Sequence, residues 1–300
     1  MTDWRRIVFG CLLAGVAAVS AWAQAPAEEG VTIRADLAYK TGRGLSVYER
    51  TRCKLDLYLP TGQTDFPTIV WFHGGALMGG SKADAVTAAV ATAFARRGVA
   101  VAVANYRLFD RVKYPAYVDD AAAATAWTVR HIAAHGGAPK KVFVSGHSAG
   151  AYLAAMVGMD PRRLRAHGLH TSAVAGVIPI SGQMLTHFTV RRERGVPNPE
   201  TTPTLDEAGP AYHARKDAPP ILCLCGGEDW PARAEENRYF IAILKANGHA
   251  ACAYQEFPGR DHGTILSLLA APDDPAMAAI LAFIAQYSPP PAAVTPPPRA

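Results

Sequence analysis

Charged residues are scarce in this chain: they make up 18% of its 300 residues, whereas half of the residues are hydrophobic. The formal net charge is +5, but no run of Lys or Arg concentrates it. The densest basic cluster, at Arg191, Arg192 and Arg194, is interrupted by Glu193, and we predict a solvated loop there rather than a patch that binds anions or nucleic acid. This balance excludes a disordered or fibrous chain, and the length suffices to bury one sizeable core.

Cysteine is also rare, with five in the chain. Cys11 lies in the leader described below, which leaves Cys53, Cys223, Cys225 and Cys252. Cys223 and Cys225 are two residues apart in a predicted strand, so they share a face but are poorly placed to bond to each other. A C-x-C pair without a second pair or a nearby His gives little support for a metal site. Buried thiols are the favoured interpretation, and a Cys225–Cys252 disulfide stays open.

No hydrophobic run near the N-terminus is long enough for a membrane helix. The apolar stretch from residue 7 to about residue 20 is shorter than the roughly 20 residues that a span needs. Two arginines precede it and small residues at Ala21 and Ala23 follow it, which is typical of a signal peptide. We therefore predict a signal peptide over residues 1–23, cleavage after Ala23, and a periplasmic or secreted protein with no stable membrane span. A retained anchor and a lipoprotein site at Cys11 are the alternatives.

Between residues 24 and 288, short apolar segments typical of strands alternate with longer segments typical of helices. Runs that are apolar at nearly every position suit strands buried on both faces, as in a parallel sheet. The predicted strands are 68–72, 99–104, 142–144, 174–180, 221–225 and 251–257, and the predicted helices are 84–97, 118–134, 149–158, 234–246 and 274–287. Gly98, Gly136 and Gly248 follow helix ends, where a left-handed residue is needed. The pattern predicts one α/β domain with a doubly wound, mostly parallel sheet.

Three segments depart from this alternation. Residues 31–59 include the alternating stretch Cys53–Leu59 and are predicted to form an antiparallel edge. Residues 183–213 carry many Pro, Thr and charged residues, and we interpret them as a small cap or lid over the site. Residues 289–300 contain two runs of three prolines and are predicted to be a disordered tail.

The segment Gly146-His147-Ser148-Ala149-Gly150 follows a predicted strand and opens a predicted helix, which is the setting that gives a G-x-S-x-G pattern its meaning. The strand-to-helix turn is tight, so a side chain two residues from the serine would clash. The turn lifts the hydroxyl above the sheet edge at a helix N-terminus, where developing negative charge is favoured. We therefore predict that Ser148 is a nucleophile, and the alternative is a tight structural turn.

A second small-residue segment, His73-Gly74-Gly75-Ala76, follows the predicted strand 68–72. Small residues let such a loop curl until its backbone N–H groups point at one centre, where they can hold the oxyanion of acyl transfer. The predicted donors are the N–H groups of Gly75, Ala76 and Ala149, the last being the residue after the nucleophile. An ordinary loop is the alternative.

A serine hydroxyl needs a base, and the base needs an anionic partner that fixes its tautomer. Along the chain the expected order is serine, acid, histidine. Two loops supply these groups at the carboxyl ends of strands, one ending in Glu228-Asp229 and one containing Asp261-His262. We predict His262 as the base and Asp229 as the acid, with Glu228 as the rival acid. Asp261 is not a candidate, because it adjoins the base and cannot readily curl back to its ring. Other histidines are predicted on helices or surface turns, at 131, 135, 167, 170 and 249, and in the cap, at 187 and 213, where they could touch substrate.

Taken in order, the segments HGGALMGGSK, ANYRL, YPAYVDDAAAATAW, GHSAGAYLAAM, CGGED and GRDHG resemble those of bacterial α/β-hydrolases of the esterase/lipase superfamily. The resemblance spans about residues 35–288 and is closest to carboxylesterases and to feruloyl-esterase-like or kynurenine-formamidase-like members. It implies an eight-stranded hydrolase sheet, an acyl-enzyme mechanism, no cofactor, and oxyanion donors at Gly75, Ala76 and Ala149. Many relatives have a third consecutive glycine at the position of Ala76, so we expect the loop to sit differently here and to restrict large acyl groups.

These observations predict a serine esterase that cleaves small-molecule esters with Ser148, His262 and Asp229. An amidase, arylformamidase or peptidase with the same triad is the nearest alternative, because leaving-group preference depends on the cap and the pocket. A non-catalytic binding module on a hydrolase scaffold is the alternative from another class, although such proteins usually lack the serine or the histidine. No metal, cofactor or nucleic-acid partner is predicted.

Overall fold

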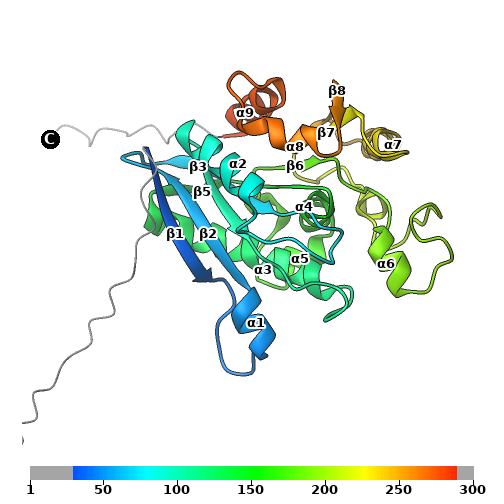
Figure 1. Ribbon diagram of the computed structural model, residues 1–300, viewed down its shortest axis with the longest axis horizontal. Coiled ribbons are helices and arrows are strands. Elements are labelled where there is room, and N and C mark those ends of the chain that lie inside the picture. The colour runs from blue at the N-terminus through cyan, green and yellow to red at the C-terminus, as the bar shows by residue number, and fades with distance from the viewer. Residues whose placement is uncertain (1–29, 289–300) are drawn as a thin grey trace, which may run out of the picture.

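The structure is a computed structural model that describes residues 30–288. Its centre is one eight-stranded sheet (Figure 1). The strand order is β1-β2-β4-β3-β5-β6-β7-β8. The strands are β1 (Val31–Ala38), β2 (Lys54–Pro60), β3 (Phe66–Phe72), β4 (Ala100–Ala104), β5 (Gly137–His147), β6 (Gly176–Ile180), β7 (Ile221–Glu228) and β8 (Cys252–Asp261). β2 pairs antiparallel with β1 and β4, and the remaining neighbours are parallel. The predicted mostly parallel sheet with an antiparallel edge is confirmed, whereas the predicted leader and tail lie outside the described residues.

Helices cover both faces of this sheet (Figure 1). The helices are α1 (Val47–Arg52), α2 (Ala85–Arg96), α3 (Ala116–His131), α4 (Ala149–Met159), α5 (Pro161–Arg165), α6 (Phe188–Glu193), α7 (Arg233–Ala246), α8 (Thr264–Ser267) and α9 (Pro275–Tyr287), with short 3-10 segments at Ile132–His135, Thr171–Ala173, Pro210–His213 and Leu268–Ala270. One hydrophobic core joins the sheet to α3, α4 and α7, and a second joins it to α2, α8 and α9. The domain therefore has three layers, α/β/α.

Each central strand is buried on both faces because its alternate side chains enter these two cores. In β3, Ile69 and Trp71 lie in the core under α2 and α9, whereas Val70 and Phe72 lie in the core under α3 and α4. None of these four side chains is more than 1% exposed. A strand with polar residues at every second position would place them in one of the cores, which explains why the sequence shows continuous apolar runs here.

The three glycines predicted at helix ends adopt the left-handed conformation. Gly98 follows α2 with a φ of 81°, Gly136 ends the 3-10 turn after α3 with a φ of 90°, and Gly248 follows α7 with a φ of 82°. A residue with a Cβ atom is strained at such φ values, so glycine lets the chain turn back towards the sheet.

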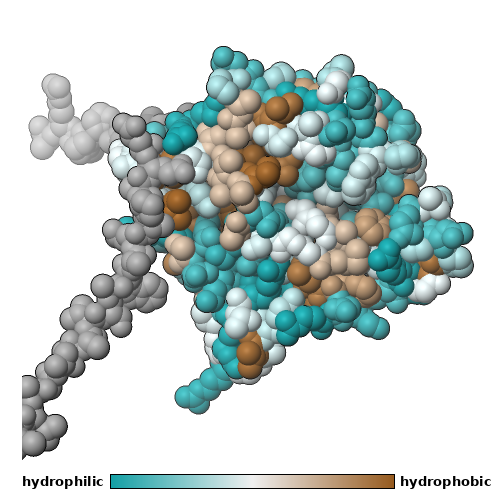
Figure 2. All heavy atoms as spheres, viewed as in Figure 1, coloured by the Kyte–Doolittle hydropathy of each residue, from teal (hydrophilic) through white to brown (hydrophobic). Residues whose placement is uncertain are grey.

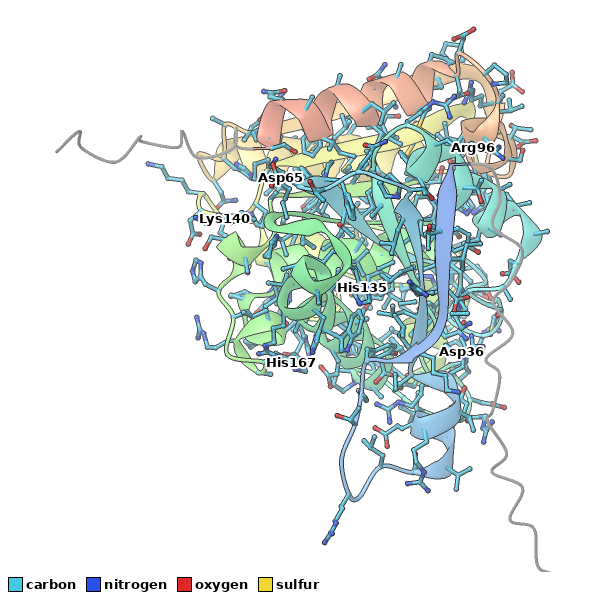
Figure 3. All side chains as sticks on the ribbon, turned by 90° about the vertical axis from the view of Figure 1, so that its left-hand side faces the viewer. Asp36, Asp65, Arg96, His135, Lys140 and His167 are labelled. Carbon is cyan, nitrogen blue, oxygen red and sulfur yellow. The ribbon has the colours of Figure 1, made fainter. Side chains whose placement is uncertain are left out.

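The edge strand β1 carries an irregularity that ties it to the loop after β3. Its register with β2 shifts after Arg34, and Asp36, labelled near one end of β1 in Figure 3, has a φ of 58°. The N–H of Asp36 donates to Asp56 Oδ1 over 2.7 Å, and Lys82 Nζ lies 3.0 Å from the Asp36 carboxylate and 2.7 Å from that of Asp56. Because Lys82 belongs to the loop between β3 and α2, these ion pairs hold that loop against the sheet.

The irregular segment 183–213 contains ordered structure and lies at the end of the molecule opposite β1 (Figure 1). His187 caps α6, because its Nδ1 accepts the N–H of Thr189 over 3.1 Å. The Thr189 hydroxyl donates to the carbonyl of Ala76 over 2.5 Å. α6 therefore contacts the loop after β3, while the role of the segment as a cap or lid stays a prediction.

The prediction of a solvated loop at the basic cluster is wrong for Arg191. Arg191 is 2% exposed and belongs to α6, whereas Arg192 and Arg194 are exposed. Arg192 forms an ion pair with Glu200, and Arg194 forms one with Asp206 over 2.7 Å. Successive residues of a helix point about 100° apart, so a short helix can turn one arginine inward and its neighbour outward, which a loop assignment did not anticipate.

The four cysteines within the described residues are buried and unpaired, in line with the favoured interpretation. The Cys225–Cys252 disulfide that the sequence left open does not form. The parallel register of β7 and β8 places Cys225 opposite Glu256 and Cys252 opposite Ile221, four residues of strand apart, or about 13 Å. Burial raises the pKa of the Cys225 thiol to about 12, so this residue stays a neutral thiol.

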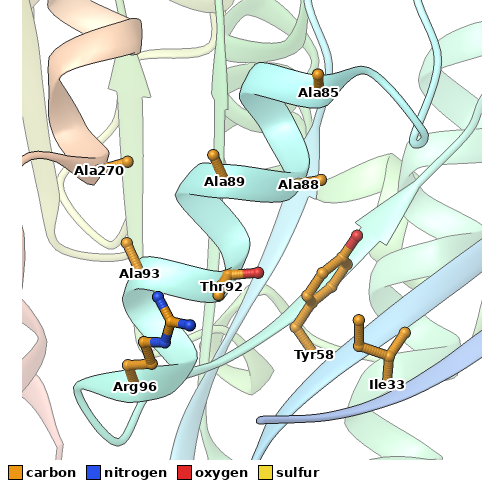
Figure 4. Close-up of a pocket in the computed structure, with 9 residues that line it drawn as sticks. All are labelled: Ile33, Tyr58, Ala85, Ala88, Ala89, Thr92, Ala93, Arg96 and Ala270. Atoms are coloured by element: carbon orange, nitrogen blue, oxygen red, sulfur yellow. The ribbon is translucent and has the colours of Figure 1, made fainter. Parts of the chain in front are cut away.

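The surface seen in Figure 2 is mostly hydrophilic, with separate hydrophobic patches between the polar side chains. A pocket of about 570 Å³ lies over α2 (Figure 4). Its lining residues are Ile33, Tyr58, Ala85, Ala88, Ala89, Thr92, Ala93, Arg96 and Ala270. None of the predicted site residues is among them, so this hollow is a gap left by the small side chains of α2.

No single helix within residues 30–288 has the length and apolar composition of a membrane span. One bent pair, Thr264–Ala270 with Pro275–Tyr287, meets the length and composition criteria only when its two helices are taken together.

Candidate active site

Ser148 sits at the sharp turn between β5 and α4. Its φ of 56° and ψ of −116° lie outside the regions that non-glycine residues usually occupy, so the backbone is strained at this point. A Cβ atom on Gly146 would lie 2.5 Å from the carbonyl oxygen of Phe72, and one on Gly150 would lie 1.9 Å from the same oxygen. Both glycines are therefore required by the close approach of β3, as the predicted clash implied.

The structure brings the three residues predicted as nucleophile, base and acid into one hydrogen-bonded line. His262 Nε2 is 2.9 Å from Ser148 Oγ, and His262 Nδ1 is 2.7 Å from Asp229 Oδ1. An ionised carboxylate only accepts, so Nδ1 carries a proton and donates it, which leaves Nε2 free to accept the proton of Ser148. Ser148 and His262 are each 8% exposed, and only 1% of the Asp229 side chain is exposed.

The rival acid Glu228 and the excluded Asp261 do not contact His262 in this way. Glu228 is exposed at the end of β7, although it directly precedes Asp229. Asp261 Oδ1 accepts the N–H groups of Gly263 and Thr264 over 2.9 and 2.7 Å, so its carboxylate caps the turn after β8. The geometry therefore matches the prediction that Asp261 does not curl back to the neighbouring ring.

Two further groups hold the Asp229 carboxylate. The Ser181 hydroxyl donates to Oδ2 over 2.5 Å, and the backbone N–H of Trp230 donates to Oδ1 over 2.7 Å. Burial raises the pKa of Asp229, but the hydrogen bonds from His262 and Ser181 outweigh burial and hold this pKa below its usual range. Asp229 is thus ionised and oriented while it faces the imidazole.

Replacing Ser181 by alanine is expected to lower kcat/KM by about 3- to 30-fold, because the carboxylate loses one of its fixed donors and orients His262 less well. The effect should fall mainly on kcat, and the acid limb of the pH–rate profile should move to higher pH. Ester hydrolysis measured from pH 5 to 9 tests this. The matched control is Ser172→Ala, at an exposed serine remote from the carboxylate. Equal pH–rate profiles for the Ser181→Ala variant and the wild type would contradict the role of Ser181 in orienting Asp229.

The loop after β3, which contains two of the predicted oxyanion donors, lies against the nucleophile turn. A Cβ atom on Gly74 would lie 3.5 Å from Ser148 Cβ. The carbonyl of Gly75 accepts the N–H groups of Met78 and Gly79 over 2.9 Å each, so the chain forms a compact turn here. Ala76 has a φ of 58°, a conformation that glycine adopts more readily. The alanine is therefore strained at the position where the sequence comparison expected a glycine. The oxyanion role of Gly75, Ala76 and Ala149 stays a prediction.

His73 supports this loop from behind. Its ring stacks on Tyr106 at 4.3 Å between centroids, its Nδ1 is 2.7 Å from the carbonyl of Gly74, and its Nε2 is 3.1 Å from a nitrogen of Arg52. Since the Arg52 nitrogen can only donate, Nε2 accepts and Nδ1 donates to Gly74. Arg52 comes from α1, which the sequence did not predict, so an edge element contributes to the shape of the site.

Sequence reasoning missed His147 and Trp230 beside His262. His147 Nε2 is 2.7 Å from the carbonyl of His262, and the two rings are 4.7 Å apart. The Trp230 ring stacks on the His262 ring at 3.7 Å with an angle of 17°. His147 holds the backbone of His262, and Trp230 holds its ring, so both fix the orientation of the imidazole. Their places in the GHSAG and GEDW segments were visible, but the contacts depend on loops that are far apart in sequence.

Because several histidines are buried, we expect the free energy of unfolding to fall in mild acid. Burial lowers the pKa of His147 to about 3 and that of His73 to about 4, from an ordinary value of 6.5. Below pH 6.5 the unfolded chain therefore binds protons that the folded chain does not, and stability falls with pH down to these folded pKa values. At pH 5 each ring contributes about 2 kcal/mol of lost stability. Burial lowers the pKa of His187 as well, which acts in the same direction.

Urea unfolding at pH 7.5 and pH 5.0 measures this loss. The unfolding free energy should be lower by about 4 kcal/mol or more at pH 5.0, and His147→Asn should make the dependence on pH shallower. His170→Asn, at an exposed ring, is the matched control and should keep the wild-type dependence. Equal stability at the two pH values would contradict the prediction.

His213 and His249 have hydrogen-bond partners other than Ser148. His213 Nε2 donates to the carbonyl of Glu207 over 2.8 Å, and His249 is buried with its Nε2 3.0 Å from the carbonyl of Pro219. The prediction of a surface turn is therefore wrong for His249. His135 and His167 are seen on the side that carries β1 in Figure 3.

Comparisons with known proteins find similarity to esterases. The BD-FAE family model matches residues 55–182, which include Ser148. Esterase LipQ of Mycobacterium tuberculosis is 31% identical over 176 residues, 53% of this chain and 41% of that protein. Esterase LipC of the same organism is 30% identical over 214 residues, 66% of this chain and 53% of that protein. The chain thus spans about half, or less, of the length of these relatives.

Solved structures match over more of the chain. Thermogutta terrifontis esterase 2, solved after phosphoramylation by tabun, is 26% identical with a TM-score of 0.64, covering 87% of this chain and 95% of that one. A truncated carbohydrate esterase from gut microbiota has a TM-score of 0.70 at 19% identity, covering 88% of this chain and 99% of that one, which supports the fold alone. The sheet, the turn at Ser148 and these matches show that the chain has the α/β-hydrolase fold and is similar to bacterial esterases.

Proposed function

We propose that this protein hydrolyses carboxylic esters of small molecules through an acyl-enzyme formed on Ser148. The observation that carries the proposal is the hydrogen-bonded line from Ser148 Oγ through His262 to Asp229, with distances of 2.9 and 2.7 Å. A hydroxyl, an imidazole and a carboxylate in this order form the arrangement that activates a serine for attack on a carbonyl.

In the first half of the reaction, Ser148 Oγ forms a bond to the carbonyl carbon while its proton moves to His262 Nε2. The carbonyl electrons move onto oxygen, and the N–H groups of Gly75, Ala76 and Ala149 are the proposed donors to that oxyanion. Asp229 stabilises the imidazolium through Nδ1. The bond from carbon to the alcohol oxygen then breaks, and the alcohol leaves with the proton from Nε2.

In the second half, water takes the place of the alcohol. His262 accepts a proton from water, the water oxygen adds to the acyl carbon, and the bond to Ser148 Oγ breaks as Oγ regains its proton. The same oxyanion donors serve both halves. No group outside these residues is needed to balance the reaction.

The names of the similar proteins support an ester as the substrate. LipQ, LipC and Thermogutta terrifontis esterase 2 are all described as esterases. Structures of Thermogutta terrifontis esterase 2 exist in forms phosphoramylated by tabun and phosphorylated by paraoxon. We extend to this chain only the shared chemistry, which is attack on an ester carbonyl by an activated nucleophile.

Two measurements test the proposal. Hydrolysis of p-nitrophenyl esters of increasing acyl length should be saturable, and matched esters should be cleaved faster than the corresponding amides. A fluorophosphonate probe should label Ser148 in the folded protein and no other residue. An unmodified Ser148 in folded protein, or faster cleavage of the amide in matched pairs, would overturn the proposal.

A further inference from the structure

A second pocket, of about 640 Å³, adjoins the proposed catalytic base. It lies between α6, the start of α7 and the loop before α7, and its wall includes Trp230, Phe188 and Leu185. Because the Trp230 ring also stacks on the His262 ring at 3.7 Å, the pocket begins one ring away from the base. The Trp230 ring thus separates the pocket from His262, and a substrate at Ser148 that extends past this ring would enter the pocket.

The first residue of α7, Arg233, is a cation in this pocket without a partner of opposite charge. Its side chain lines the pocket, although the residue is only 6% exposed. Within residues 30–288 its guanidinium has no hydrogen-bond acceptor and no carboxylate within 4.0 Å. Its described contact is with the Trp230 ring, whose centroid lies 5.7 Å from Cζ. Burial of a charge is unfavourable unless an opposite charge or acceptors meet it, so the site is suited to an anionic group.

Arg191 of α6 adds a second buried cation to the same wall. It is 2% exposed, one of its terminal nitrogens donates to the carbonyl of Thr202, and its Nε has no hydrogen-bond partner among the described atoms. Two arginines thus line one pocket, and the guanidinium of Arg233 is the one without any acceptor in the described part of the chain. Burial lowers the pKa of both arginines, which reflects how little water surrounds them.

The acidic residues of the pocket already have partners. Glu236 Oε2 accepts the backbone N–H of Met184 over 3.1 Å, and Glu200 forms an ion pair with Arg192 outside the pocket wall. Asp229 and Glu236 contribute to the potential at Arg233, but neither lies within ion-pair distance of it. The donors of Arg233 are therefore not used by the protein itself.

We propose that Arg233, assisted by Arg191, binds a carboxylate on the substrate, so that the enzyme prefers esters that carry a negative charge beyond the scissile bond. The inference rests on the proposed esterase function and specifies its substrate class. A guanidinium fork binds a carboxylate with two parallel hydrogen bonds, and the apolar walls of Trp230, Phe188 and Leu185 would hold the carbon chain that joins it to the ester.

Matched substrate pairs test the preference in the wild-type enzyme. On the acyl side the pair is mono-4-nitrophenyl adipate and its neutral amide isostere, 4-nitrophenyl adipamate. On the alcohol side the pair is the butyrate ester of 4-hydroxybenzoate and that of 4-hydroxybenzamide. We expect kcat/KM for the anionic member to exceed that of the neutral one by about tenfold or more in one of the pairs, with a lower KM. That pair also shows which end of the substrate enters the pocket.

Variants then locate the preference. Arg233→Gln should reduce the ratio of anionic to neutral kcat/KM towards one, and Arg233→Lys should retain part of it. The matched control is Arg238→Gln on the same helix, at an exposed arginine paired with Glu235 and Glu256, which should leave the ratio unchanged. A general loss of activity or stability in a variant lowers kcat/KM for both members of a pair, so it leaves their ratio unchanged.

The failures are distinguishable. No hydrolysis of any member of the pairs would overturn the esterase proposal itself. Hydrolysis of neutral and anionic members at equal rates by the wild type would overturn the carboxylate site alone. A preference that persists in Arg233→Gln would also overturn it, because the selectivity would then arise elsewhere.

Discussion

Replacing Ser148 by alanine is expected to reduce kcat for ester hydrolysis by a factor of about 10⁴ or more while the protein stays folded. The oxygen that forms the bond to the substrate is lost, and what remains is the contribution of substrate binding and of the oxyanion donors. The substitution removes a single oxygen from a strained turn, so the fold should persist. Hydrolysis of p-nitrophenyl butyrate, measured with circular dichroism and thermal unfolding, tests both parts of this expectation.

The control for this experiment is Ser145→Ala, three residues earlier in β5. Ser145 is buried and its hydroxyl donates to the carbonyl of Ile178 over 2.6 Å, so its loss should lower stability without removing the nucleophile. Wild-type turnover in Ser148→Ala would move the nucleophile to another residue and end the proposed mechanism.

Replacing Gly150 by alanine is expected to abolish activity and to destabilise the fold by more than about 3 kcal/mol. The added Cβ atom would lie 1.9 Å from the carbonyl oxygen of Phe72 and 2.7 Å from that of His73. These are backbone atoms of a central strand and of the loop beside Ser148, so neither can rotate away as a side chain could. Relief of the clash requires α4 to move from β3, which displaces Ser148 from His262.

Urea unfolding and ester hydrolysis of the Gly150→Ala variant measure this effect. Gly79→Ala is the matched control, because a Cβ atom there would meet only the Gly75 carbonyl oxygen at 3.9 Å, an ordinary contact. We expect the control to change the unfolding free energy by less than about 1 kcal/mol. A Gly150→Ala protein with wild-type stability would contradict the steric argument for the nucleophile turn.

Most of the fold could be predicted because its signals are local. Continuous apolar runs arise where a strand is covered on both faces, and the left-handed positions after helices need glycine, so both could be recognised in sequence. Prediction failed at α1 and α6, since helices of six residues have too little periodicity to be recognised. The burial of Arg191 was missed for the same reason, because it depends on which side of that short helix meets the domain.

The sequence by itself determined the order of the three candidate groups along the chain: a serine in a glycine-flanked turn, then an acid after a strand, then a histidine after the last strand. These positions could be assigned because each needs a particular residue type beside a strand end. Only the tertiary structure decided which groups meet. Ser181 reaches Asp229, Trp230 covers His262, and Arg233 faces a pocket without an acidic partner. Contacts between loops far apart in sequence depend on how the sheet and its helices pack, and no local pattern encodes that packing.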